Sequence, residues 1–184
     1  MTNQNISLIE TIRESFGRIV YTHKTHEKMT EIFESKRGWA TAGEIIATSL
    51  TASGLISLNF YNDNFIKISA ALLAFLSLSM ALYKSFAMLD NRIGSHQKTA
   101  WKLWIMRERY INLISDVSEN RISDQEAQKI RDDLQTETHK IYEDAPQTTA
   151  CAYAKAQKAL KKSEDFTFTA DEINRFLPKS LKIP

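Results

Sequence analysis

Two long stretches without a charged side chain constrain this sequence more than any other feature. They cover residues 45–62 and 68–83. Each can be lengthened by a few residues on its N-terminal side if one charge is admitted, Glu44 in the first and Lys67 in the second. The lengthened stretches are about 20 residues each, enough for a helix to cross a hydrocarbon core of about 30 Å. The predicted membrane spans are residues 39–58 and 65–83.

The composition of both spans suits lipid. The first is rich in small and hydroxylated side chains, which let membrane helices approach closely, and the second is rich in leucine with interspersed serine. Aromatic side chains stand at the ends of the pair, as in an interfacial belt. They are Trp39, Phe60, Tyr61, Phe65, Tyr83 and Phe86. The alternative is a buried hairpin in a soluble protein. A chain of 184 residues could hardly cover two helices that are apolar all round, so residues 38–86 are interpreted as a two-helix transmembrane hairpin.

Lysine and arginine flank this hairpin on one side. Four precede the first span and four follow the second, namely Lys24, Lys28, Lys36 and Arg37, then Lys84, Arg92, Lys98 and Lys102. The connecting turn, residues 59–64, has none. Such an excess predicts that both termini are cytoplasmic. Because the first 37 residues lack the apolar core of a cleavable signal, we expect the hairpin to insert without one.

The remaining segments predict helices, so we expect an all-α integral membrane protein. Residues 1–37 carry apolar side chains at spacings of three and four, the pattern of an amphipathic cytoplasmic helix, with a break or bend near Gly17. Residues 87–120 are expected to continue the second span as one long cytoplasmic stalk helix, unbroken from residue 65 to 117 and kinked at Gly94. The expected inner stripe of the stalk is Ile93, Ala100, Trp104, Ile111 and Ile114.

Residues 121–184 predict a C-terminal helical domain. Ser123 opens its first helix in a capping box with Glu126, and the inner face of that helix is expected at Ala127, Ile130, Leu134 and Ile141. Pro146 is expected to start the next helix, residues 148–163, which has a stripe of small side chains. That stripe is Ala152, Ala156 and Ala159. Thr169 and Glu172 form a second capping box, leading a short helix to Leu177.

Motifs of catalysis are missing from the sequence: it has no Gly-rich phosphate loop, no H-E-x-x-H and no G-x-S-x-G. We therefore expect no enzyme and no cofactor. The single cysteine, Cys151, excludes a disulfide framework and is expected to pack within its helix. His23 and His26 share a helical face, but no further ligand lies nearby in sequence, so no metal site is expected. The net charge of +2 argues against a nucleic-acid polymer as partner.

Glu44 is the acidic residue one to two turns inside the first predicted span. A carboxylate there costs a few kcal/mol unless it is paired, neutralised or facing water. One interpretation is that it reaches the headgroup water of the cytoplasmic interface. The other is that Glu44 from several subunits lines a water-filled pore.

Cations, histidines and aromatic residues flank the hairpin on its predicted cytoplasmic side. If the segments before and after the hairpin pack together, such a mixture can hold a nucleotide through phosphate contacts and base stacking. The candidate nucleotide-binding residues are Tyr21, His23, Lys24, His26, Lys98, Lys102, Arg107 and Arg109. The alternative assigns Trp101 and Trp104 to the core and the arginines to solvated ion pairs.

At these residues the sequence resembles the SLATT family of small bacterial two-span membrane proteins. The resemblance rests on the run from Tyr21 to Lys28, on Tyr83-Lys-Ser-Phe86, and on His96-x-x-x-Ala100-x-x-Leu103-x-x-x-Arg107-Glu-x-Tyr110-x-x-Leu113, and it covers about residues 15–118 well. The C-terminal helices resemble an extension found in some members. The resemblance implies an inner-membrane effector of antiphage systems, partnered with nucleotidyltransferase synthases of cyclic di- or oligonucleotides, as in CBASS-like operons.

The expected mechanism is assembly into a homo-oligomer that permeabilises or depolarises the membrane and causes growth arrest or cell death. Two spans cannot enclose a pore alone, so several copies are required. A cytoplasmic ligand can bias such an assembly only by binding one state more tightly than the other. The alternative is a membrane anchor that recruits a cytoplasmic partner through its C-terminal helices without conducting ions.

Overall fold

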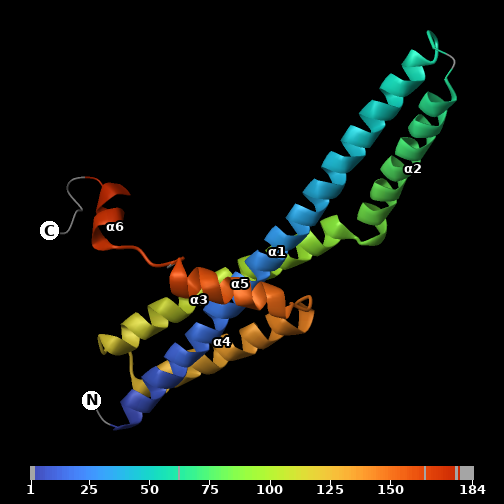
Figure 1. Ribbon diagram of the computed structural model, residues 1–184. Helices are drawn as coiled ribbons and strands as arrows, with labels where there is room; N and C mark the ends of the chain where they lie inside the picture. Colours follow the sequence, from blue (N-terminus) through green and yellow to red (C-terminus); the bar gives the residue numbers. More distant parts are fainter. Residues whose placement is uncertain (1–2, 62, 164, 177, 179–184) are drawn as a thin grey trace.

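A computed structural model describes residues 3–61, 63–163, 165–176 and 178. Across these residues every regular element is a helix, which confirms the all-α prediction. Figure 1 shows two long helices that form a hairpin at one end and a helical bundle at the other. The helices are α1 (Asn3–Ser57), α2 (Asn64–Phe86), α3 (Leu89–Ser118), α4 (Asp124–Asp144), α5 (Ala150–Lys162) and α6 (Ala170–Phe176).

Helix α1 runs without interruption through both the N-terminal amphipathic segment and the first predicted span. Its 55 residues correspond to about 80 Å at 1.5 Å per residue. The bend expected at Gly17 is therefore wrong. A lone glycine costs a helix about 1 kcal/mol, and Ile12 and Ile19, both buried, hold this segment in the core on either side of it. The bundle and the hairpin consequently share one continuous helix.

Helix α2 returns antiparallel to α1 after the turn, where the Asp63 carboxylate caps α2 by accepting from the Phe65 amide at 2.8 Å. Small side chains bring the two helices close together, as their composition predicted. Ala47 and Ala70 are buried between them, and Thr48 Oγ1 lies 2.6 Å from Ser77 Oγ. Large apolar side chains point outward from this pair instead. They include Trp39, Ile45, Ile46, Leu50, Leu55, Phe65, Ile68, Leu72, Phe75, Leu78 and Phe86.

By length and composition, one helical stretch among the described residues can cross a membrane. It lies within residues 64–118, and 6% of its most apolar window is buried inside the protein. The first predicted span does not qualify by the same measure, because Glu44 and several serines and threonines lower its hydropathy. An apolar helix that the protein itself leaves uncovered needs another apolar environment.

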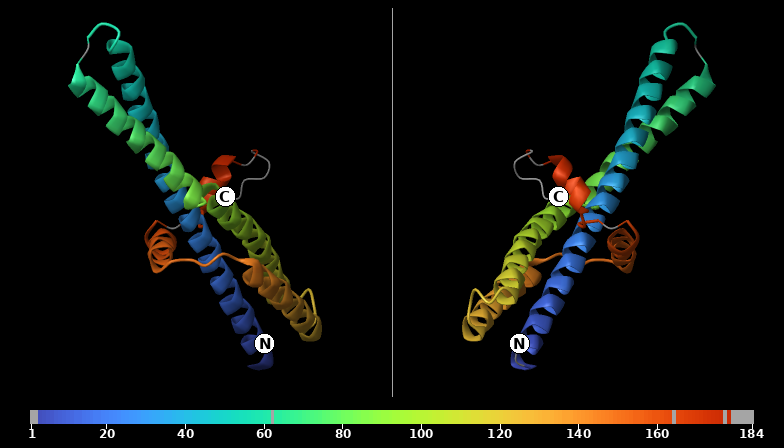
Figure 2. Two further views of the ribbon diagram at one scale, coloured as in Figure 1. Left: turned by 90° about the vertical axis from the view of Figure 1, so that its right-hand side faces the viewer. Right: turned by 90° about the vertical axis from the view of Figure 1, so that its left-hand side faces the viewer.

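A turn at Ala87 and Met88 separates α2 from α3, so the prediction of one unbroken helix from residue 65 to 117 is wrong. Met88 adopts a left-handed conformation, with φ of 49°. The kink expected at Gly94 is also wrong, because Gly94 lies inside α3 with open space around it. Figure 1 shows that α3 turns away from the direction of α2, and Figure 2 shows that α3 crosses α1.

Helices α1 and α3 pack along a seam with a strict seven-residue repeat. The buried positions that follow this repeat on α1 are Ile12, Ile19, His26, Phe33 and Ala40, and on α3 they are Leu89, His96, Leu103, Tyr110 and Val117; further residues of both helices are buried beside them. A seven-residue repeat keeps one face of each helix toward its partner, as in a coiled coil. The expected stripe on α3 is thus displaced: Ile93 and Ala100 are buried, whereas Trp104 is exposed and Ile111 and Ile114 are half-buried.

Helix α4 packs against α3 and α1 with the inner face that the sequence predicted. Ser123 caps it by accepting from the Glu126 amide at 3.2 Å, and Ala127, Leu134 and Ile141 are buried, with Ile130 packed beside them. The inner face of α4 is therefore confirmed, and it completes the core below the α1–α3 seam.

Helices α5 and α6 follow in the C-terminal part. Ala152, Ala156 and Ala159 are buried where α5 packs on α1, which confirms the predicted stripe of small side chains. Thr149, not Pro146, caps the start of α5. In the second capping box, Thr169 and Glu172 exchange hydrogen bonds as predicted. Helix α6 stands apart from the other helices, and its predicted end, Leu177, lies outside the described residues (Figure 1).

Candidate functional site

A cleft of about 860 Å³ opens between α1 and α3 at the bundle end of the hairpin. Its α1 wall consists of residues spaced by one helical turn: His23, Lys24, Glu27, Thr30 and Glu31. Its α3 wall consists of Gln97, Ala100, Trp101 and Trp104, at the same spacing. Phe166, from the segment between α5 and α6, completes the lining. The volume is in the range of pockets that bind drug-sized ligands.

Lys24 is a buried cation, with 7% of its surface exposed. Its ammonium lies 2.9 Å from Glu27 Oε2 and 2.8 Å from Asp165 Oδ2. Burial alone would lower the pKa of Lys24, but the hydrogen bonds to Asp165 and Glu27 outweigh burial and raise it above its ordinary value. The cleft therefore holds a fixed positive charge that requires an anionic partner.

Glu27 balances part of that charge. His23 Nε2 lies 3.4 Å from Glu27 Oε1. The hydrogen bond from His23 is the main cause that lowers the pKa of Glu27 to about 2; the Lys24 ammonium adds to it, and burial opposes it. Among the buried polar atoms that the structure describes, Nδ1 of His23 and Oγ1 of Thr30 have no hydrogen-bond partner. Both atoms belong to residues that line the cleft, and both are buried in this structure.

Aromatic rings lie at both sides of the cleft. The Phe166 ring stacks on His23 with centroids 5.3 Å apart and planes at 9°, and Lys24 Nζ lies 4.6 Å from its centroid. The Arg107 guanidinium carbon lies 5.1 Å from the same centroid. Opposite, Trp101 and Trp104 meet edge to face at 5.9 Å. Their surfaces are 68% and 43% exposed, so the assignment of these two tryptophans to the core is wrong.

The candidate nucleotide-binding residues divide into two groups. His23 and Lys24 line the cleft, and Arg107 reaches its edge through Phe166. The other five lie elsewhere. Tyr21 contacts Tyr153 of α5, His26 is buried against His96, Lys98 is exposed on α3, Lys102 pairs with Asp144, and Arg109 pairs with Glu137. The structure thus brings three of the eight together.

Several lining residues were not predicted, although their spacing could have indicated them. Glu27 and Thr30 continue the helical face that His23 begins, and Gln97 lies one turn before Trp101. No local pattern indicates Asp165 and Phe166, because they reach the cleft from a loop far along the chain.

His23 and His26 face different neighbours, the first Glu27 and the second His96. Within the described part of the chain, no group of three or more His, Cys, Asp or Glu side chains could hold a metal ion. Cys151 is exposed on α5, so the expectation that it packs inside is wrong.

Glu44 is paired. The Lys84 ammonium, at the end of α2, donates to Glu44 Oε2 and also to Thr41 Oγ1 at 3.3 Å. Both charged side chains are about one quarter exposed. The carboxylate inside the first predicted span is therefore neutralised by the helix beside it, one of the conditions that makes such a charge tolerable in a membrane.

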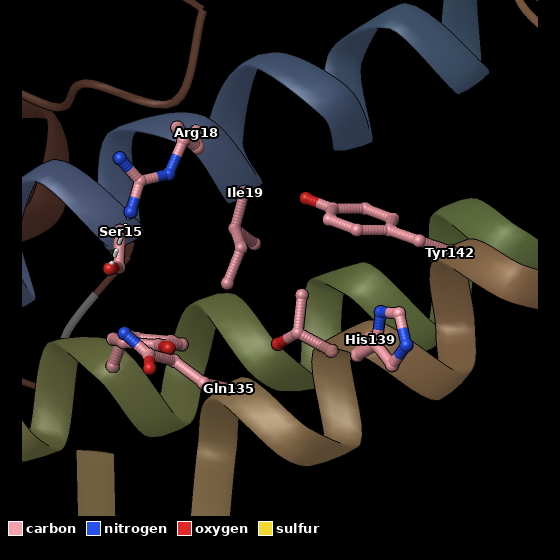
Figure 3. A pocket seen from close by; sticks show the side chains of 8 residues that line it. Ser15, Arg18, Ile19, Gln135, His139 and Tyr142 are labelled. Atoms are coloured by element: carbon pink, nitrogen blue, oxygen red, sulfur yellow. Dashed lines mark hydrogen bonds between the residues drawn. The ribbon is translucent and has the colours of Figure 1, made fainter. Parts of the chain in front are cut away.

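A smaller pocket lies farther from the hairpin, between α1, α3 and α4. Figure 3 shows side chains of α1 and α4 that line it, with Arg18 turned toward Ser15, whose hydroxyl accepts from the guanidinium at 2.9 Å. His139 and Tyr142 of α4 lie opposite. The pocket measures about 190 Å³, below the range of about 300 Å³ and more that is typical of small-molecule sites. The cleft beside Lys24 is therefore the better candidate for a ligand.

The arrangement defines a class: an all-helical protein whose apolar helical hairpin is joined to a helical bundle with a ligand-sized cleft. Residues 8–172 match the model of the SMODS and SLOG-associating 2TM effector domain, family 4, and the chain belongs to this SLATT family. Membership indicates a membrane effector of defence systems. No curated protein and no solved structure matches the chain.

Proposed function

We propose that this chain is a bacterial inner-membrane effector of an antiphage system, controlled by a cyclic di- or oligonucleotide that binds the cleft between α1 and α3. In this proposal α1 and α2 cross the membrane as a hairpin, with both termini in the cytoplasm. Ligand binding shifts a homo-oligomer toward a state that permeabilises or depolarises the membrane, and the cell stops growing or dies. The chain acts by binding and assembly, not by catalysis.

The observation that carries this proposal is the continuity of α1. Thr30, in the wall of the cleft, and Trp39, at the start of the first span, lie on one unbroken helix about 13 Å apart. A ligand that changes the packing of α1 against α3 thereby acts directly on the helix that enters the membrane. No flexible linker separates the two, since α1 has no break between them.

The distribution of basic side chains supports the proposed orientation, with both termini in the cytoplasm. Basic side chains lie at the bundle end of the hairpin, where Arg37 pairs with Asp90 at 2.8 Å and Lys84 pairs with Glu44. The turn at residues 59–64 has no Lys or Arg. The positive-inside rule therefore favours a cytoplasmic bundle and a periplasmic turn.

The chemistry of the cleft supports a nucleotide. Trp101 and Trp104 offer exposed π surfaces for bases, Lys24 offers a buried positive charge for phosphate, and Glu27 and Glu31 can accept hydrogen bonds from amino groups of a base. A ligand that binds the active state 100-fold more tightly contributes about 2.7 kcal/mol to the shift, enough to invert a modest bias.

The test is membrane potential in bacteria that express the chain, measured with a voltage-sensitive dye. We expect depolarisation when the chain is co-expressed with a nucleotide-cyclising synthase, and an unchanged potential beside a catalytically inactive synthase. The two cultures are matched in membrane-inserted protein. An unchanged potential beside a panel of active synthases would contradict the proposed control.

A second candidate function is a non-conducting anchor, favoured by the C-terminal part. Phe168, Ile173 and Phe176 are exposed on and beside α6, which stands apart from the bundle (Figure 1). Such side chains suit a cytoplasmic partner. Co-purification of that partner, dependent on these three residues and accompanied by an intact potential, would favour the anchor over the pore.

A further inference from the structure

The segment between α5 and α6 contributes a consecutive acid and aromatic ring to the cleft. Asp165 Oδ2 lies 2.8 Å from the buried Lys24 ammonium, and the Phe166 ring stacks on His23. Arg107 approaches the same ring at 5.1 Å. The Asp165 carboxylate on a buried cation, next to a flat ring that stacks on an imidazole and lies near a guanidinium, reproduces the contacts expected of a nucleotide phosphate and base.

The backbone of this segment is in an unfavourable conformation. Phe166 has φ of 74°, in the left-handed region that a residue with a Cβ atom adopts rarely. Such a conformation persists only where surrounding contacts hold it. Here the contacts are those with His23, Lys24 and Arg107, together with the hydrogen bond from the Asp165 amide to the Ala159 carbonyl at 3.2 Å.

We infer that Asp165 and Phe166 form an autoinhibitory internal ligand, which occupies the cleft until a cyclic nucleotide displaces it. This inference rests on the proposed nucleotide site. The carboxylate stands in for a phosphate on Lys24, and the phenyl ring stands in for a base on His23. Because either occupant supplies an anion, the buried Lys24 ammonium stays paired in both states, and exchange leaves no uncompensated charge.

Displacement of the segment also affects the helices on either side of it. Asp165 and Phe166 connect α5, which packs on α1, to α6, which stands apart from the bundle. Ligand entry thus changes the contacts of α1 at the cleft and frees the attachment of α6 in the same event. One exchange links nucleotide binding to both the membrane helix and the C-terminal surface.

The test compares nucleotide affinity of full-length variants in nanodiscs of zwitterionic lipid. The probes are fluorescently labelled cyclic dinucleotides that carry guanine, adenine or both. The variant Asp165→Asn with Phe166→Gly removes the anion and the ring and relieves the left-handed conformation, so the fold should be retained. Phe168→Ala, an exposed ring two residues further on, is the matched control. Asp165→Asn alone provides a second variant with the ring intact.

We expect the double variant to bind the best probe about tenfold more tightly than the unmodified chain. If Asp165 and Phe166 leave the cleft free in about one molecule in ten of the unmodified chain, its apparent affinity is lowered about tenfold. The single variant should fall between them, and Phe168→Ala should bind like the unmodified chain. Equal, measurable affinity in all variants would overturn the inference and leave the nucleotide site standing. Absence of binding to any probe in any variant would overturn both.

Discussion

His26 and His96 meet across the seam between α1 and α3, with their Nδ1 atoms 2.8 Å apart. One ring must donate and the other accept, so the two neutral imidazoles share a single proton at this contact. Both occupy the seven-residue repeat that is otherwise apolar at Ile19 and Leu103. A buried polar pair in an apolar seam disfavours other registers, because a shifted register would leave each ring without a partner.

Acid should loosen this seam. Burial, followed by the charges of His96 and His23, lowers the pKa of His26 to about 4, and burial together with Arg92 lowers the pKa of His96. In the unfolded chain the two histidines have their ordinary pKa near 6.5, so below that pH the unfolded chain binds more protons than the folded chain. The contribution of the histidine pair to the free energy of unfolding is fully present above about pH 6.5 and is lost as the pH falls toward 4. At pH 4, His26 alone has lost about 3 kcal/mol of it.

Thermal unfolding in non-ionic detergent at pH 7.5 and pH 5.0 measures this dependence. The control is His26→Leu with His96→Leu, which replaces both partners by apolar groups and should flatten the dependence in this pH range. Equal losses of melting temperature in the two proteins would show that the pair is not the acid-sensitive element.

Removal of one histidine should be worse than removal of both. His96→Leu leaves His26 buried without its partner, and an orphaned buried donor costs about 1–3 kcal/mol. For a chain of this length we expect a fall of about 2–4 °C in melting temperature per kcal/mol. A single variant as stable as the double one would contradict the shared-proton contact.

The paired tryptophans should contribute directly to ligand affinity. Base stacking on an aromatic side chain is worth about 1–3 kcal/mol, so Trp101→Ala or Trp104→Ala should weaken nucleotide binding by roughly 5- to 150-fold. Ile105→Ala is the control, because Ile105 is about as exposed as Trp104 and does not line the cleft. Equilibrium binding of a labelled cyclic dinucleotide measures both. Unchanged affinity in both tryptophan variants would exclude these rings as the stacking platform.

Replacement of Glu44 should abolish conductance and leave membrane insertion unchanged. Glu44→Leu removes the carboxylate that Lys84 neutralises, and if that carboxylate lines a pore in the assembled form, depolarisation should be lost. The charge-swapped variant, Glu44→Lys with Lys84→Glu, keeps the pair and should assemble normally. Carbonate extraction measures insertion and a voltage-sensitive dye measures conductance. Full depolarisation by an inserted Glu44→Leu variant would contradict the pore-lining interpretation.

The sequence predicts those parts of the fold that short-range patterns encode. The capping box at Ser123, the inner face of α4 and the alanine stripe of α5 each depend on spacings within one helix, and the structure confirms them. The turn at Met88 was missed because no glycine or proline marks it; α3 leaves the direction of α2 there because its seam packs on α1. That is a tertiary preference, which overrides the local tendency to continue a helix.

The candidate site was only partly predictable for a similar reason. His23 and Lys24 were identified by their residue types beside the hairpin, and the structure brings them together with Arg107 at the cleft. Residue type also predicts Lys102 and Arg109, which are cations on the same helix as Arg107, yet they face α4 and pair with its carboxylates. The register of the seam determines which face of α3 packs on α1. Residue type alone does not predict that register.

The glycines of the long helices offer a last prediction, because their surroundings differ. Gly17 and Gly94 have open space where a side chain would begin, whereas a Cβ at Gly43 would lie 2.6 Å from the end of the Met80 side chain. Alanine is favoured over glycine in a helix interior by about 0.5–1 kcal/mol, so Gly17→Ala and Gly94→Ala should each raise the melting temperature by about 1–4 °C. Gly43→Ala should gain less or lose, because Met80 must move out of the α1–α2 contact. If helix bends at Gly17 or Gly94 were needed for the fold, those alanine variants would instead unfold at lower temperature in the same detergent melts.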